Sequence, residues 1–199
     1  MTSIQFFLKV TPREPFVNLH ELNMLQGGLR IIINDTIVTR YTDEQEDPGF
    51  RGGMIYYILS GCLNCIHPLF TGKKCTIPDM SSGGLFIFTP RGERTCVQYL
   101  DFDPDIDLIN RHIRIVKSGE QKVVSCESQN QRYPNYPDGT CVSTILLAKE
   151  IIKICDEFLR HLESMKDSPD EYIDRYRESL NNTKKVLEDY PKYHSEIIN

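Results

Sequence analysis

Cys62 and Cys65, with His67 and Cys75 close behind them, are the residues whose types and spacing come nearest to a chemical site. Cysteine and histidine at short spacing are typical zinc ligands, and a Cys-x-x-Cys pair can also serve in thiol redox chemistry. Zinc knuckles place their ligands in turns, whereas these two cysteines stand within an apolar stretch. A thioredoxin-type pair opens a helix after a strand, and this pair falls well inside a predicted helix. We therefore favour a buried helix over a metal or redox site.

The stretch from residue 53 to residue 67 has the apolar spacing of a helix with one buried face. That face is predicted to consist of Ile55, Leu59, Cys62 and Ile66, extended by Ile58 and Cys65. Gly61 in the middle of a helix costs about 1 kcal/mol relative to alanine, which suggests close approach of another backbone, that of a sheet. The seven cysteines are expected to be mostly small buried apolar residues, which a cytosolic location would keep reduced.

A second candidate nucleophile is Cys141 in "GTCVS", at the predicted start of a long helix, where a thiolate could be stabilised. Thr140 or Ser143 acting as a helix cap explains the same residues better. The histidines are scattered, and the sequence contains no GxSxG, HExxH or glycine-rich phosphate loop. We therefore predict no catalytic residue, no metal and no cofactor. An enzyme that uses Cys141 or the Cys62/Cys65 pair remains an alternative.

Two acidic clusters are the candidate partner-binding residues. They are Asp43, Glu44, Glu46 and Asp47 in the first cluster and Asp101, Asp103, Asp105 and Asp107 in the second. The second alternates like the start of an EF-hand, but Ile106 and His112 stand where the calcium loop needs glycine and glutamate. Both clusters are expected in exposed loops, where negative charge can attract a basic protein partner.

The totals are those of a globular chain of 199 residues, with 40% apolar and 26% charged residues. A net charge of −5 argues against nucleic acid as the main partner, because a phosphate backbone selects basic surfaces. No stretch reaches the roughly 20 apolar residues of a membrane span, and the first residues do not resemble a signal peptide. A cytoplasmic location is therefore expected.

The order of predicted elements indicates an α+β fold with an antiparallel sheet built from hairpins. The strand elements are a strand over 3–10, a hairpin turning at Asn34-Asp35, a hairpin of Leu85–Phe88 with Thr95–Leu100 across Pro90 to Gly92, and a strand pair around Ser118-Gly119. The helices span 53–67, 141–165 and 168–189; the second should lie on the sheet, and the last is polar and should pack loosely. Residues 1–166 are predicted to form the domain, with 167–199 as its helical appendage.

The layout of these segments resembles bacterial immunity-type proteins encoded beside polymorphic or contact-dependent toxins. The resemblance covers roughly residues 25–165: a "GGLRIIINDTIVTRY" hairpin, an acidic loop, the "GGMIYYILSGCLNCI" helix, the "GLFIFTPRGERTCVQYL" hairpin and the "VSTILLAKEIIKICDEFLRHL" helix. It implies a single α+β domain that binds one toxin and blocks it, without chemistry of its own.

The leading hypothesis is thus a non-enzymatic binding module that occludes a basic toxin domain, with the two acidic clusters as contacts. The alternatives are a cysteine-dependent or redox enzyme, and a structural or regulatory subunit that dimerises through residues 168–189. Monomer and homodimer are both compatible with the sequence.

Overall fold

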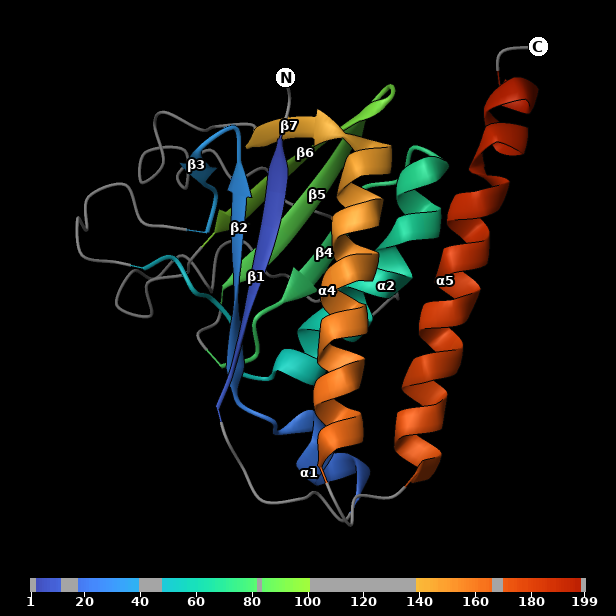
Figure 1. The fold of residues 1–199 in the computed structure, drawn as a ribbon. Coiled ribbons are helices and arrows are strands. Elements are labelled where there is room, and N and C mark those ends of the chain that lie inside the picture. The colour runs from blue at the N-terminus through green and yellow to red at the C-terminus, as the bar shows by residue number, and fades with distance from the viewer. Residues whose placement is uncertain are drawn as a thin grey trace, which may run out of the picture.

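The computed structural model describes residues 3–11, 18–39, 48–81, 84–100, 139–165 and 170–197. These residues form two antiparallel sheets and a set of helices that covers them (Figure 1), which confirms the predicted α+β class. Helices α2 and α4 pack against the strands and against each other, and α5 forms an outer layer on both of them. The predicted strand pair around Ser118-Gly119 lies outside the described residues.

The first sheet has the order β1 (Ile4–Val10), β2 (Gly27–Ile33), β3 (Thr36–Ile37). As predicted, β2 and β3 turn at Asn34 and Asp35, whose φ angles of 49° and 65° are those of a tight type I′ hairpin. Pairing along β2 continues through bridges from Arg51 and Met54. One face of this sheet is buried because it carries the apolar residues Ile4, Phe6, Leu29, Ile31 and Ile33.

The second sheet has the order β4 (Cys75–Pro78), β5 (Leu85–Arg91), β6 (Arg94–Leu100), β7 (Thr140–Ser143). The hairpin of β5 and β6 forms as predicted, but its turn lies further along the chain, at Gly92 and Glu93. Pro90 belongs to β5 and pairs with Thr95. Gly92 is the residue that takes the left-handed backbone angle of the turn, with φ 60°, so the strands continue up to it.

Helix α1 (Leu19–Asn23) is a short helix whose Asn18 side chain accepts a hydrogen bond from the Glu21 N–H at 3.0 Å. Helix α2 (Ile55–Phe70) carries its six predicted face residues in the core, as expected. Gly61 is indeed a point of close approach, but to a side chain rather than to a backbone. A Cβ at this position would lie 2.9 Å from the Ile77 Cγ2 atom of β4.

Helix α4 begins at Thr144 and ends at Ser164, so the prediction that it starts at Cys141 is wrong. Residues 140–143 instead form β7, which pairs with β6. The junction is held by the Thr144 N–H, which donates to the Glu93 carbonyl at 3.0 Å, and by the Thr95 and Thr144 hydroxyls, 2.9 Å apart. As predicted, the helix lies against a sheet, and its main strand contact is with β1.

Helix α5 (Asp170–Ile197) is longer than predicted and continues past residue 189. Its apolar residues are sparse, as expected, but they pack tightly rather than loosely. Ile173, Tyr176, Leu180 and Tyr190 are buried in the same apolar cluster as the strands. The Tyr176 ring lies 5.5 Å from that of Phe158 on α4, and the Tyr190 ring lies 4.1 Å from that of Phe70 on α2. These buried residues of α5 therefore pack on the surface formed by α2 and α4.

The described helices include none that is both long and apolar enough to cross a bilayer.

The burial of α5 predicts a stability cost for Leu180→Ala. Leu180 is fully buried, so we expect the substitution to lower the free energy of unfolding by about 2–5 kcal/mol in urea titrations. Glu188→Ala, at an exposed position of the same helix, is the matched control and should change it by less than about 0.5 kcal/mol. Equal effects of the two substitutions would contradict tight packing of α5.

Candidate binding surface, buried thiols and the α2–α5 groove

The eight acidic residues proposed as partner contacts lie outside the described residues, but the chain on either side of the first cluster is well defined. Buried Thr39 accepts a hydrogen bond from the Ile31 N–H at 3.2 Å through its hydroxyl, and the same hydroxyl donates to the Gly49 carbonyl. The two ends of segment 40–47, which contains Asp43 to Asp47, are thereby tied together beside β2.

An aromatic–arginine stack of Phe7, Arg30 and Phe50 lies on the outer face of the first sheet, next to this anchor. Phe7 and Arg30 are direct cross-strand partners on β1 and β2. The Arg30 guanidinium carbon lies 4.5 Å from the centre of the Phe7 ring and 4.9 Å from that of Phe50, and Nη1 donates to the Pro48 carbonyl at 3.4 Å. Contacts of this kind contribute about 0.5–1 kcal/mol each at exposed sites, so they order the guanidinium on the surface.

The second sheet meets the first at Arg51 and Tyr99. The Arg51 guanidinium carbon lies 6.0 Å from the centre of the Tyr99 ring. The Tyr99 hydroxyl donates to buried Asp79 at 3.0 Å, and the other carboxylate oxygen of Asp79 accepts from the Ser81 hydroxyl at 2.7 Å and from its N–H at 3.1 Å. This network fixes the end of β6, which is followed directly by the second acidic cluster in the sequence.

Two cysteines of the second sheet form a disulfide, which corrects the expectation that the cysteines are reduced. Cys96 on β6 and Cys141 on β7 are direct cross-strand partners, and their sulfur atoms are bonded. Antiparallel pairing brings such partners close enough for this bond, which a sequence separation of 45 residues does not reveal. Cys141 is therefore a strand residue in a disulfide, and not a thiol at a helix start.

The four free cysteines among the described residues lie close to one another in and beside the core. Cys62 and Cys155 are fully buried, Cys65 is buried and Cys75 is half-buried, which confirms the buried-apolar prediction for the first three. The Cys155 thiol donates to the Leu59 carbonyl at 3.8 Å. Burial raises the pKa of Cys155 to about 12. Burial also raises the pKa of Cys62, and the neighbouring Cys155 raises it further. These two thiols stay protonated at neutral pH and are poor nucleophiles.

The four residues weighed above as possible zinc ligands do not share one site. His67 is exposed, whereas Cys62 and Cys65 point into the core. No group of three or more histidine, cysteine, aspartate or glutamate side chains within the described ranges is arranged to hold a metal ion. The other described histidines, His20, His161 and His194, lie on three different helices.

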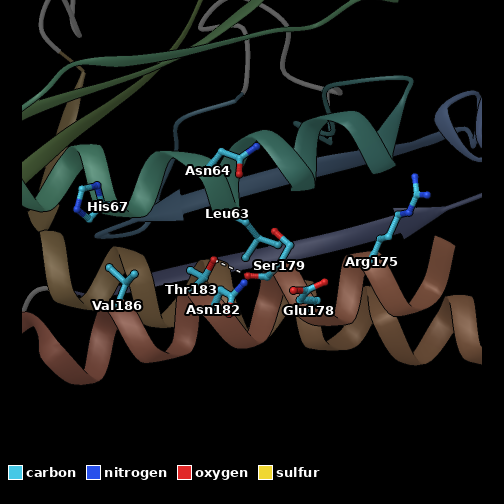
Figure 2. A pocket seen from close by; sticks show the side chains of 9 residues that line it. All are labelled: Leu63, Asn64, His67, Arg175, Glu178, Ser179, Asn182, Thr183 and Val186. Carbon is cyan, nitrogen blue, oxygen red and sulfur yellow. Dashed lines mark hydrogen bonds between the residues drawn. The ribbon is translucent and has the colours of Figure 1, made fainter. Parts of the chain in front are cut away.

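A groove of about 410 Å³ runs between α2 and α5 and is lined largely by polar side chains (Figure 2). Asn64 and His67 line it from α2, and Glu178 and Asn182 line it from α5. The hydroxyl of Thr183 is bonded to its own helix, where it donates to the Ser179 carbonyl at 2.9 Å. The groove can therefore offer amide hydrogen bonds to a polar ligand.

Comparisons of the chain with models of known protein families, with curated proteins and with solved structures found no match. The function is therefore argued from geometry and charge.

The buried thiols predict a loss of stability at alkaline pH. The pKa of Cys155 is raised from 9.0 to about 12, so both folded and unfolded chains bind the proton below pH 9. As pH rises from 9 towards 12, only the unfolded chain releases it, and the free energy of unfolding falls.

In Cys155→Ala the free energy of unfolding should fall less steeply with pH than in the wild type. Between about pH 10 and pH 11 the difference in slope should reach up to about 1.4 kcal/mol per pH unit in urea titrations. Leu159→Ala, on the same helix, should lower stability at every pH without changing the slope, because leucine does not titrate. Equal slopes in the wild type and Cys155→Ala would contradict the shifted pKa.

Proposed function

We propose that this chain is a non-enzymatic protein-binding module that neutralises one cognate protein, a toxin of basic character, by covering its active site. The observation that carries the proposal is the aromatic–arginine stack on the outer face of the first sheet, next to the anchor of an acidic segment. The proposed contacts are this stack and the acidic residues Asp43 to Asp47 and Asp101 to Asp107.

The stack has the properties of a binding hot spot. Arginine and aromatic side chains contribute disproportionately to protein–protein affinity. Phe7 is 36% exposed, on the outward phase of β1, so this large apolar ring is available to a partner. Both rings already hold the Arg30 guanidinium in place. Binding of a partner there therefore costs less side-chain entropy than it would if Arg30 had to be ordered on binding.

The two acidic clusters are attached to the fold at neighbouring places. Asp47 directly precedes Pro48, which accepts the Arg30 hydrogen bond, and Asp101 directly follows Leu100 at the end of β6. Arg51 and Tyr99, which are in contact, lie four residues after Asp47 and two residues before Asp101. The described residues that flank the two clusters therefore lie close together, which supports a single basic partner for both clusters.

The rival hypotheses receive less support. An enzyme that uses Cys141 as its nucleophile would need a free thiol, and Cys141 is in a disulfide. Cys62 is buried, and its pKa is raised. Dimerisation through α5 would have to use its polar side, because Ile173, Tyr176 and Leu180 are buried within the chain itself. Neither rival has a feature as ordered as the Arg30 stack in its favour.

The test of the proposed function is co-expression with the proteins encoded by the two neighbouring genes. We expect one of them to inhibit growth alone, to be harmless with this chain, and to form a complex on size-exclusion chromatography whose affinity falls with added salt. If neither protein is toxic and neither binds, the proposal fails.

The stack itself predicts the effect of Phe7→Ala on that complex. Removing one ring from Arg30 should weaken binding by about 5- to 30-fold in calorimetric titration, equivalent to about 1–2 kcal/mol. Leu146→Ala is the matched control, because Leu146 is 37% exposed on a different element, α4. This variant should bind the partner with the affinity of the wild type. Equal weakening by both substitutions would remove the stack from the interface.

A further inference from the structure

Cys65 and Cys75 form a thiol pair at the junction of α2 and β4. Cys65 lies in the last turns of α2, and Cys75 is the first residue of β4, so the turn over residues 71–74 brings them together. The Cys75 sulfur lies 3.8 Å from the Cys65 carbonyl oxygen and 3.6 Å from that of Lys73. Cys75 is half-buried and Cys65 is buried beneath it, so a reagent from solvent reaches Cys75 first.

The two thiols differ in reactivity because they interact with each other. Hydrogen bonding between them lowers the pKa of Cys75, and the same bond, together with burial, raises the pKa of Cys65. A half-exposed thiol with a lowered pKa is the usual attacking group in disulfide exchange. Once Cys75 is in a mixed disulfide it is no longer the anion that holds the Cys65 proton, so Cys65 can lose that proton and resolve the product as a thiolate.

We propose that Cys65 and Cys75 are an oxidisable dithiol, which an anionic small-molecule disulfide such as glutathione disulfide converts into a second disulfide that links α2 to β4. In the first step the Cys75 thiolate attacks one sulfur of glutathione disulfide, a Cys75–glutathione bond forms, and one glutathione leaves as thiolate. In the second step the Cys65 thiol gives its proton to solvent and attacks the Cys75 sulfur, which expels the second glutathione. Two protein thiols are oxidised and one glutathione disulfide is reduced to two glutathione molecules.

The surface around Cys75 favours an anionic disulfide. Lys73 and Lys74 directly precede Cys75 and are exposed, and glutathione disulfide carries carboxylates that these ammonium groups attract. The proposed function does not enter this inference, because the pair lies on the α2–β4 junction and not on the aromatic–arginine stack.

The product would tie the end of α2 to the second sheet. The new bond joins residues ten positions apart, Cys65 and Cys75, and removes freedom from the unfolded chain. Helix α2 contributes most of its length to the core, so restraining its end should raise the melting temperature.

The experiment treats the full chain, with its Cys96–Cys141 disulfide intact, with glutathione disulfide at about pH 8 and maps the linked peptides by mass spectrometry. We expect a Cys65–Cys75 peptide link in the wild type, a glutathione adduct retained on Cys75 in Cys65→Ser, and neither link nor adduct at this site in Cys75→Ser. Under native conditions iodoacetamide should label Cys75 at least about tenfold faster than Cys62, Cys65 and Cys155.

Cys62→Ala is the matched control, because Cys62 lies on the same helix one turn from Cys65, and it should form the Cys65–Cys75 link as the wild type does. Each variant is first checked for the native circular dichroism spectrum and for the Cys96–Cys141 link. A wild-type chain that gives no link at Cys75, a link between Cys62 and Cys65 instead, or an adduct on Cys75 that persists equally with and without Cys65 would each overturn the proposal.

Discussion

The packing of α2 against β4, α4 and α5 at once is the constraint on which the rest of the structure depends. One side of the helix meets β4 so closely that Gly61 leaves no room for a Cβ beside Ile77. Another side meets α4, where the Cys155 thiol reaches the carbonyl of Leu59, and the last turn meets α5 through Phe70. A helix in this environment must be apolar around much of its circumference and needs a small residue where the strand comes close. The sequence from Ile55 to Phe70 meets both requirements, with Gly61 at the close approach.

Much of this arrangement could be predicted from the sequence because the determining signals are local. The Asn34-Asp35 turn and the apolar face of α2 each depend on residues within a few positions of one another. The strand β7 could not be predicted, because "TCVS" directly continues into a helical pattern and only pairing with β6 makes it a strand. The tight packing of α5 was also hidden, since four buried residues in a polar helix matter only once α2 and α4 form the surface that receives them.

For the candidate site, too, local features could be predicted from the sequence, whereas contacts between distant segments could not. Charge runs are visible in any sequence, so the acidic clusters could be named, but the stack on Arg30 depends on contacts among three separate segments. One signal was present: Phe7 falls on the outward phase of a strand whose other outward residues, Gln5 and Lys9, are polar. Cys65 lies in a predicted helix and Cys75 lies outside every predicted element, so nothing in the sequence indicates that the turn between α2 and β4 brings one close to the other.

The Cys96–Cys141 bond has a consequence for the long stretch of chain between its two ends. It closes a covalent ring at the base of that stretch, across the paired strands β6 and β7. A protease that cuts once anywhere inside the ring would therefore leave two pieces that do not separate, with β7 and the two C-terminal helices still joined to the rest of the chain.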